Sequence, residues 1–546
     1  MTAAPPPETA RGSGVLILLP SLACLTGLLM QFRFMIFSGL GQIQGGLGDG
    51  RLVGFTLEHG YRWLLQIEPH QDFWKPPIFF PYPNASAFTD TMLGFAPLYW
   101  LPRLLGAAPD TALQWWTLIV YGLNFSAGYA LLRKGPGLGI LSSSAGALLV
   151  GIISVAWIGH LQLFPFFYVL LAMLALYRIH DTGDGAPGDG ARRAWIGVFC
   201  ACAVLQLWGG VYTFLFFGLL AALALIVSLS LRNVRPTVVQ HLRRDAIIWI
   251  LGLALSAAAV APLVDRYGMT AEESGYRHYT TVNIPSAHSW ILLPQQAEWL
   301  SQRQVPISPD FRSKGIGLLT FGVGLAGLRV RRRLTSVQVL GIATLMLMLL
   351  GTRYGDFSPW RLIYEIVPGA GAIRAHHRLT MIVIPAAVIG VALACEAALR
   401  RRRWLLAVLL VAVCIGERSV TQKTIDKQFV RDHVLQVAER VDPGSEAFLL
   451  LPTNRDARWV ADDAAAVALA TGTPAVNGRY GNFPDSYGIR RLIHPSEEDP
   501  DRRKLKKALA EWLDKWGVDP DGVQLIEYEG LTKEATKPYR SRLTRR

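Results

Sequence analysis

Charged residues are scarce in this sequence. Asp, Glu, Lys and Arg make up only 17% of its 546 residues, whereas soluble proteins carry about 25%. Hydrophobic residues account for 51%, and the mean hydropathy is +0.30. Several apolar runs reach the roughly 18 to 20 residues that a helix needs to cross a bilayer. The composition therefore predicts an α-helical polytopic membrane protein that ends in a more polar tail.

Cysteines are few and several catalytic motifs are missing. All five cysteines fall inside apolar runs, which favours buried thiols over a disulfide framework. The polar segments hold no P-loop, HExxH or GxSxG motif, which argues against nucleotide-dependent phosphoryl transfer, zinc proteolysis and serine hydrolase chemistry. The net charge is +14. Much of this surplus lies in short loops between apolar runs, where it indicates membrane topology and not nucleic-acid binding.

Eleven apolar runs are predicted to be transmembrane helices. They cover residues 14–37, 113–132, 138–157, 161–179, 194–210, 212–230, 246–264, 315–329, 335–351, 376–398 and 403–418. Basic clusters follow every second helix, and the positive-inside rule makes their side the cytoplasm. The N-terminus is then cytoplasmic, and we expect a multi-pass protein of a cell inner (plasma) membrane.

Four polar segments are predicted on the outer side of the membrane. They are the loops 38–112, 265–314 and 352–375 and the tail 419–546. The tail follows a transmembrane module, 1–418, and has helical patterns at 434–441 and 502–518 and strand patterns at 446–452 and 523–530. It is expected to form a small α/β domain that binds an acceptor glycan, partner proteins or the membrane surface, or that simply packs over the outer loops.

The outer segments also carry a family resemblance. Five stretches carry it: GDGRLVGFTLEHGYRWL (48–64), IFFPYPNASAFTDTMLGFAPLYW (78–100), GHLQLFPFFYVLLAMLALYR (159–178), VPGAGAIRAHHRLTMIVIPAAVIGVAL (367–393) and TGTPAVNGRYGNFPDSY (471–487). Together with a first helix, a long outer loop bearing an early acidic residue and many helices joined by short inner loops, they resemble the GT-C superfamily of integral membrane glycosyltransferases. The resemblance is to a bacterial branch with uncharacterised members.

The resemblance implies both a reaction and a catalytic group. It implies transfer of a hexosyl or pentosyl group from a polyprenyl-phosphate-linked donor to an envelope glycan, lipid or protein. In this superfamily an acidic residue in the first outer loop acts as the base or holds a divalent metal, and Asp49 matches that position. The metal would be Mg or Mn. The alternative is that Asp49 only caps the helix that follows it.

Two further acids and one histidine are candidates near Asp49. Glu58 and His59 follow it on the same predicted helix and reach a shared site only if that helix lies over the cavity; otherwise they line a polar surface. Asp90 is either a second catalytic carboxylate or the cap of the segment after it.

Four residues near predicted helix ends are candidates for binding substrate. His160 and Gln162 lie between two apolar runs, where polar groups at membrane depth suit sugar hydroxyls; the alternative is a wet turn. Arg374 and Arg378 lie at the entry of a late helix, where arginine binds donor phosphate or simply snorkels to the interface.

Two other functions fit the same sequence. A lipid or polysaccharide transporter or flippase would favour inverted repeats and interrupted helices, and no clear repeat is present. A non-catalytic subunit of an envelope assembly complex would use the same acids for structure alone.

Overall fold

The structure is a computed structural model of the 546-residue chain. It describes residues 12–44, 47–155, 158–180, 188–274, 281, 284–291, 315–330, 335–418, 424–453, 459–491 and 502–530. Much of the predicted outer loop 265–314 lies outside these ranges, as do 492–501 and 531–546 of the tail.

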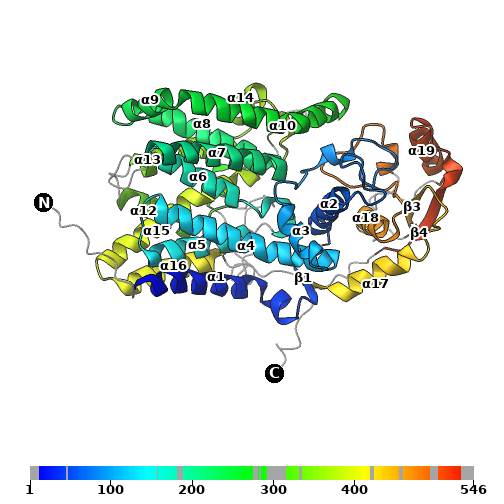
Figure 1. Ribbon diagram of the computed structural model, residues 1–546, viewed down its shortest axis with the longest axis horizontal. Coiled ribbons are helices and arrows are strands. Elements are labelled where there is room, and N and C mark those ends of the chain that lie inside the picture. The colour runs from blue at the N-terminus through cyan, green and yellow to red at the C-terminus, as the bar shows by residue number, and fades with distance from the viewer. Residues whose placement is uncertain are drawn as a thin grey trace.

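Most of the described chain is a layered bundle of roughly parallel and antiparallel helices (Figure 1). Each of the eleven predicted spans contains a helix. These are α1 (Gly12–Phe37), α4 (Pro109–Lys134), α5 (Ile140–Val155), α6 (Phe167–His180), α7 (Asp189–Gly209), α8 (Val211–Ser230), α10 (Ala246–Ser274), α12 (Leu318–Val330), α13 (Thr335–Leu350), α15 (Thr380–Arg400) and α16 (Trp404–Arg418). Short helices α9 (Arg235–Arg244) and α14 (Trp360–Ile366) join them.

Among the described residues, five helical segments are long and apolar enough to cross a membrane, and three shorter helices are also apolar. The chain is thus a multi-pass membrane protein, while the number of eleven crossings stays a prediction.

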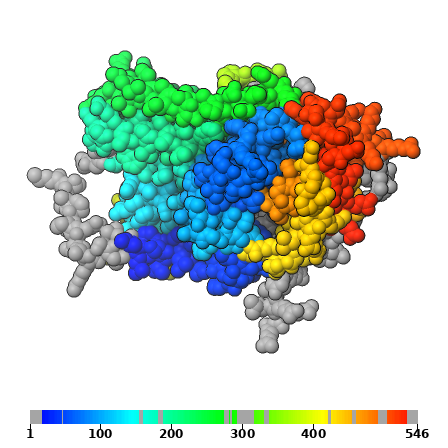
Figure 2. All heavy atoms as spheres, turned by 45° about the vertical axis from the view of Figure 1, so that its right-hand side comes forward, coloured from blue at the N-terminus to red at the C-terminus, as the bar shows by residue number. Residues whose placement is uncertain are grey.

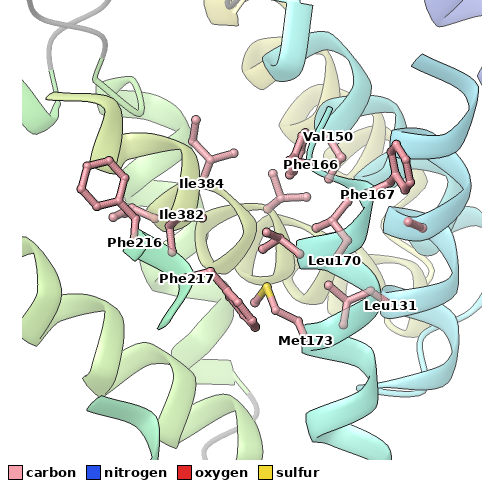
Figure 3. Packing of buried hydrophobic residues seen from close by; sticks show 14 of the residues in the cluster. Leu131, Val150, Phe166, Phe167, Leu170, Met173, Phe216, Phe217, Ile382 and Ile384 are labelled. Carbon is pink, nitrogen blue, oxygen red and sulfur yellow. The ribbon is translucent and has the colours of Figure 1, made fainter. Parts of the chain in front are cut away.

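The centre of the bundle is filled by large apolar side chains (Figure 3). They come from α4, α5, α6, α8 and α15, and include Leu131, Val150, Phe167, Leu170, Met173, Phe217 and Ile384. Lipid tails are as apolar as these side chains, so close packing must hold the helices together. Gly327 of α12 and Gly390 of α15 allow it: a Cβ atom at Gly327 would lie 1.8 Å from the carbonyl oxygen of Gly390.

A polar module packs against one end of the bundle (Figure 1). Its strands are β1 (Gln42–Gln44), β2 (Thr424–Asp426), β3 (Ala447–Pro452) and β4 (Val523–Tyr528), and its helices are α2 (Asp49–Leu64), α3 (Pro97–Leu104), α17 (Lys427–Ala438), α18 (Val460–Thr471) and α19 (Arg502–Asp514). β3 and β4 pair in parallel, and β1 pairs with β2 in antiparallel fashion. The two predicted strands are confirmed. The helix predicted at 502–518 is observed as α19, which ends at Asp514, and the helix predicted at 434–441 overlaps the last turns of α17, which ends at Ala438. Helix α18 was not predicted.

The module is built from both the first loop and the tail. Phe79 and Tyr82 of the loop share one hydrophobic core with Tyr480 and Trp512 of the tail. The indole N–H of Trp512 donates to the carbonyl oxygen of Phe80 at 2.8 Å. Figure 2 shows the blue loop and the yellow to red tail forming one continuous face. The module therefore includes residues on both sides of the predicted boundary at 418.

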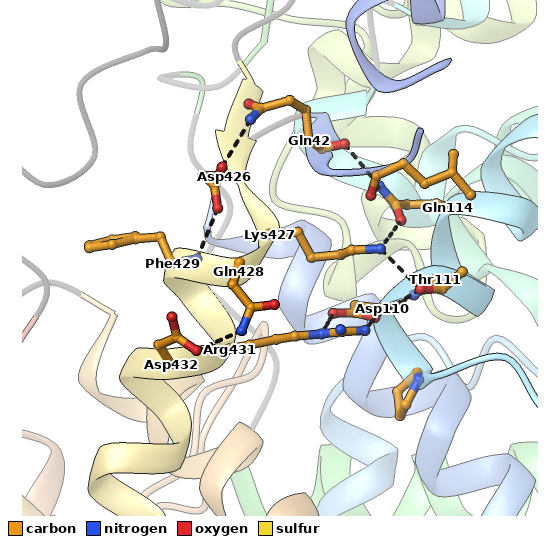
Figure 4. Close-up of polar contacts among 12 residues, drawn as sticks. Gln42, Asp110, Thr111, Gln114, Asp426, Lys427, Gln428, Phe429, Arg431 and Asp432 are labelled. Atoms are coloured by element: carbon orange, nitrogen blue, oxygen red, sulfur yellow. Dashed lines mark hydrogen bonds and ion pairs between the residues drawn. The ribbon is translucent and has the colours of Figure 1, made fainter. Parts of the chain in front are cut away.

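A polar junction ties α17 of the module to the start of α4 in the bundle (Figure 4). Arg431 makes a two-pronged ion pair with Asp110 at 2.5 and 2.6 Å. The ammonium group of Lys427 donates to Thr111 and Gln114, each at 3.0 Å. These contacts fix the module relative to the helices.

Helix α2 lies between the two hydrophobic cores. Val53, Leu57 and Tyr61, spaced four residues apart, join the bundle core, while Phe55 points into the module core. The same helix is thus buried on two faces, and its N-terminus lies where bundle and module meet.

Candidate active site

Asp49 is the first residue of α2. The N-cap position of this helix is occupied by Gly48, and no side chain makes a capping hydrogen bond there. Asp49 is therefore not the N-cap residue of α2. An acidic group in the first helical turn is favoured by the helix dipole. Gly48 is also required for packing, because a Cβ atom there would lie 2.7 Å from the ring of Trp459.

The carboxylate of Asp49 gathers three side chains from distant parts of the chain. Its Oδ2 accepts from Nδ1 of His160 at 2.6 Å and from Nε2 of Gln162 at 3.3 Å. Its Oδ1 accepts from Arg479 at 3.1 Å. An ionised carboxylate has about four lone-pair positions, so one on Oδ1 is left for a substrate hydroxyl. With 25% of its side chain exposed, Asp49 is within reach of a ligand.

The surroundings of Asp49 keep it ionised. Burial by itself would raise its pKa. The hydrogen bond and the charge of His160, with smaller contributions from Gln162 and Arg479, outweigh burial and hold the pKa of Asp49 below its ordinary value.

Arg479 and Asp462 belong to this site and were not singled out from the sequence. Arg479 pairs with Asp49 on one side and with Asp462 at 3.2 Å on the other, and its guanidinium lies 5.7 Å from the centre of the Trp459 ring. Burial raises the pKa of Asp462 to about 7, although Arg479 and Arg51 oppose the rise. The only hint in the sequence was that Arg479 lies in the glycine-flanked stretch NGRYG.

Asp90 lies on the other side of Gln162. Its Oδ1 accepts from the backbone N–H of Val211, the first residue of α8, at 2.9 Å. Gly210 lies between the two groups: a Cβ atom there would be 3.6 Å from the carbonyl oxygen of Gln162 and 3.9 Å from the carboxyl group of Asp90. Asp90 therefore caps α8, and not the segment after it. Burial raises its pKa, although Val211 and the charge of Arg378 act against the rise.

Arg378 is a buried cation whose charge acts on Asp90 without forming an ion pair. Its residue is only 7% exposed, and its guanidinium lies 4.8 Å from the centre of the Tyr212 ring. Within the described ranges it forms no ion pair, and its Nε has no hydrogen-bond partner. A buried charge is costly unless something pairs with it, so this position favours an anionic ligand.

Arg374 lies on the exposed edge of the same cluster. Its backbone N–H donates to the hydroxyl of Tyr212 at 3.1 Å, and its guanidinium donates to the carbonyl oxygen of Gly481 at 3.1 Å. It thus links the entry of α15 to the module, next to the aromatic ring on which Arg378 lies.

Six of the candidates from the sequence are therefore gathered at one end of the bundle. From Asp49 and His160 the cluster runs through Gln162 to Asp90, and from there to Arg378 and Arg374. The cluster thus has the carboxylate of Asp49 at one end, His160, Gln162 and the carboxyl group of Asp90 in the middle, and two arginines at the other end.

Glu58 is not brought into this cluster. It is completely buried and accepts from Arg103 with both carboxylate oxygens, at 2.7 and 3.0 Å. Arg62 and the hydroxyl of Tyr99 also donate to it, at 2.9 and 2.8 Å. Helical geometry places it about 13 Å from Asp49 along the axis. Its environment is that of a structural ion pair.

His59 is likewise placed in the interior. Its ring stacks between Phe55 and Phe73, and Nε2 lies 2.9 Å from the carbonyl oxygen of Phe73. Since a carbonyl only accepts, Nε2 carries the proton, and Nδ1 accepts from Nδ1 of His70 at 2.8 Å. Burial lowers the pKa of His59 to about 4. Both nitrogens are used, which leaves none for substrate.

The residues around Asp49 do not suit a divalent cation as they stand. Mg²⁺ and Mn²⁺ prefer several oxygen ligands, whereas Asp49 already accepts from a histidine, an amide and an arginine. A cationic guanidinium 3.1 Å from the carboxylate opposes a second cation. Within the described part of the chain, no group of three His, Cys, Asp or Glu residues is arranged to hold a metal.

Comparisons with known proteins agree with this architecture. No protein-family model and no curated protein sequence matches the chain. Among solved structures it is similar to the arabinofuranosyltransferase AftD from mycobacteria, with a TM-score of 0.53 and 15% identity over 86% of this chain and 32% of AftD. It is also similar to ArnT from Cupriavidus metallidurans, with a TM-score of 0.50 and 11% identity over 92% of this chain and 91% of ArnT.

These structures are GT-C glycosyltransferases. The chain therefore has the GT-C fold, and the resemblance expected from the sequence is confirmed at the level of the fold. The present chain spans about a third of the length of AftD.

Proposed function

We propose that this protein is a membrane glycosyltransferase that moves a sugar from a polyprenyl-phosphate donor to a hydroxyl of an envelope glycan, lipid or protein. The order of the site carries the proposal: a carboxylate with a spare lone pair at one end, and a buried unpaired cation at the other. A glycosyl transfer needs a base, the sugar and the leaving phosphate in that order.

The proposed reaction is a single displacement at the anomeric carbon. The acceptor hydroxyl gives its proton to Asp49 while its oxygen forms a bond to that carbon. The bond between the anomeric carbon and the phosphate oxygen breaks, and its electron pair stays on the phosphate. The products are the glycoside and a polyprenyl phosphate. The low pKa of Asp49 makes it a weak base, which suffices because the hydroxyl becomes acidic as its oxygen bonds to carbon.

Arg378 is proposed to hold the phosphate, with Arg374 as a second contact at the exposed edge. Negative charge grows on the phosphate as the bond breaks, and a fixed cation in a partly dry site stabilises it strongly. Arginine suits phosphate because its guanidinium offers two parallel N–H donors. His160 and Gln162 are proposed to orient Asp49 and the sugar.

The site is proposed to face the outer side of a cell inner membrane. The positive-inside rule places the loops near Arg133, Arg193 and Arg244 in the cytoplasm, and with them the end of the bundle opposite the module. Nucleotide sugars are not available on the outer side, which favours a lipid-linked donor that has already been carried across.

Sugar transfer in proteoliposomes tests the proposal. The purified protein would be given labelled polyprenyl-phosphate sugars and a crude envelope fraction as acceptor, and wild type would be compared with Asp49→Asn. We expect transfer by wild type and a loss of about 10²- to 10⁴-fold in the variant. Asp356→Asn is the matched control, because Asp356 is an exposed carboxylate in the segment 352–375 and its substitution should leave transfer unchanged.

The alternatives predict different outcomes. Transfer that survives Asp49→Asn would remove Asp49 from the chemistry. No transfer from any donor by well-folded wild type would reject the glycosyltransferase and favour a transporter or a non-catalytic subunit.

A further inference from the structure

The joint between α7 and α8 lies in the cluster between Asp49 and Arg378. Two adjacent glycines at this joint have very different surroundings. At Gly209 a Cβ atom would lie 2.2 Å from the ring of Phe95, so the helix packs directly against it. At Gly210 the nearest atom to a Cβ would be 3.6 Å away. Of these two glycines, only Gly210 has room beside it for a methyl group.

This space is lined by oxygen atoms. The atoms nearest to the missing Cβ of Gly210 are the carbonyl oxygen of Gln162 and the carboxyl group of Asp90. The side-chain Oε1 of Gln162 is buried and has no partner among the described residues. Asp90 uses one described bond, from Val211 to Oδ1. A buried acceptor is normally paired, so Oε1 of Gln162 favours a ligand that brings a hydroxyl donor, and a second hydroxyl can donate to the carboxyl group of Asp90.

The position fits the reacting sugar. Gln162 donates to Asp49 at 3.3 Å, and the charge of Arg378 opposes the rise that burial causes in the pKa of Asp90. A ring bound over Gly210 thus has the proposed base on one side and the proposed phosphate contact on the other. Sugar hydroxyls supply the donors that Gln162 and Asp90 lack.

We propose that Gly210, Asp90 and Gln162 form the subsite for the hydroxyl-bearing edge of the transferred sugar, and that the absent side chain of Gly210 sets the size of sugar accepted. This inference rests on the proposed function, and extends it from the reaction to the selection of the donor. Gly210 is a specificity-determining residue, and the two acceptors orient the ring.

Gly210→Ala tests the inference, because this substitution should not destabilise the folded protein. The backbone at Gly210 has a φ of −176°, which is an extended conformation that alanine adopts, and the added methyl meets nothing closer than 3.6 Å. Two donors would be compared that share a lipid and differ at one ring position: a hexosyl polyprenyl phosphate and the pentosyl analogue without the hydroxymethyl group. We expect the ratio of hexosyl to pentosyl kcat/KM to fall by about 10-fold or more, the usual effect of one carbon in a pocket.

Gly218→Ala is the control. Gly218 lies on the exposed side of the same helix with no atom within 4 Å of its missing Cβ, so the variant should keep the wild-type ratio. If wild type uses only one of the two donors, we expect the loss of about 10-fold or more with that donor in Gly210→Ala and none in Gly218→Ala.

Each outcome has a distinct meaning. Transfer by Gly210→Ala with the wild-type ratio, or an equal loss with both donors, would overturn this inference and leave the proposed function standing. Absence of transfer from any donor by wild type would overturn the proposed function, and the inference with it.

Discussion

Replacement of Glu58 by glutamine should damage the fold and spare the chemistry. Glu58 accepts from Tyr99, Arg62 and Arg103 in a completely buried position. Its two arginine partners are also mostly shielded, with side-chain exposures of 19% and 18%. Glu58→Gln keeps the volume and removes the charge, so two shielded cations lose their counter-ion.

The expected loss of stability follows from these contacts. Removing one partner of a buried ion pair costs about 3 to 5 kcal/mol. Glutamine still offers one oxygen acceptor, which retains part of the hydrogen bonding. We therefore expect the free energy of unfolding to fall by about 3 kcal/mol, toward the lower end of that range.

Thermal or denaturant unfolding of the protein in detergent measures this loss. The control is Glu365→Gln, because Glu365 forms the same kind of pair with Arg361, also at 2.9 Å, but at 55% and 69% side-chain exposure. An exposed pair of this kind contributes about 0.2 to 1 kcal/mol. Transfer per folded molecule should be unchanged in both variants. A Glu58→Gln protein as stable as wild type but unable to transfer sugar would refute this reasoning and restore Glu58 as a catalytic group.

Three further results are expected. His160→Ala removes the hydrogen bond and the charge by which His160 lowers the pKa of Asp49, so the acid limb of the pH–rate profile should move to higher pH; an unmoved limb would separate His160 from Asp49. The pKa of Asp462 is raised to about 7 in the folded protein, against about 3.9 in the unfolded chain. The folded state therefore binds an extra proton, and the free energy of unfolding should fall as pH rises from about 4 to 7. Asp462→Asn should remove this part of the pH dependence of unfolding, and an identical slope in both proteins would contradict it. Gly327→Ala puts a methyl against backbone of α15 and should cost about 1 to 3 kcal/mol of unfolding free energy, whereas Gly322→Ala, with open space at its Cβ, should cost little; equal stabilities would show that the two helices separate freely.

Much of the helical framework could be predicted from the sequence, because apolar runs are local signals. Every predicted span contains a helix. The clustering of Asp49 with His160 and Gln162 was also accessible, since all three lie next to predicted helices at the same end of the bundle. Their contact distances, and the link from Gln162 through Gly210 to Asp90, required the structure.

The parts of the site that the sequence does not provide depend on long-range contacts. Glu58 was predicted as a site residue because it follows Asp49 on the same helix. Helical periodicity does not show that Arg103 pairs with its carboxylate. Arg479 was missed because its contact with Asp49 joins residues that are 430 positions apart. Helix α18 is rich in alanine and lacks a strong amphipathic pattern. It was therefore not predicted, unlike the other helices and strands of the tail.

If the base and the phosphate contact lie at opposite ends of one sugar site, substitutions at the two ends should affect donor binding and catalysis differently. Donor KM and kcat would be measured in proteoliposomes for wild type, Asp49→Asn and Arg378→Gln. The proposed arrangement predicts that Asp49→Asn lowers kcat by about 10²-fold or more with donor KM nearly unchanged. It predicts that Arg378→Gln raises donor KM by about 10- to 100-fold, the loss of a charge-assisted contact, and also lowers kcat, because the charge that grows on the phosphate loses its cation. Equal changes of both constants in both variants, or normal transfer by Arg378→Gln, would contradict it.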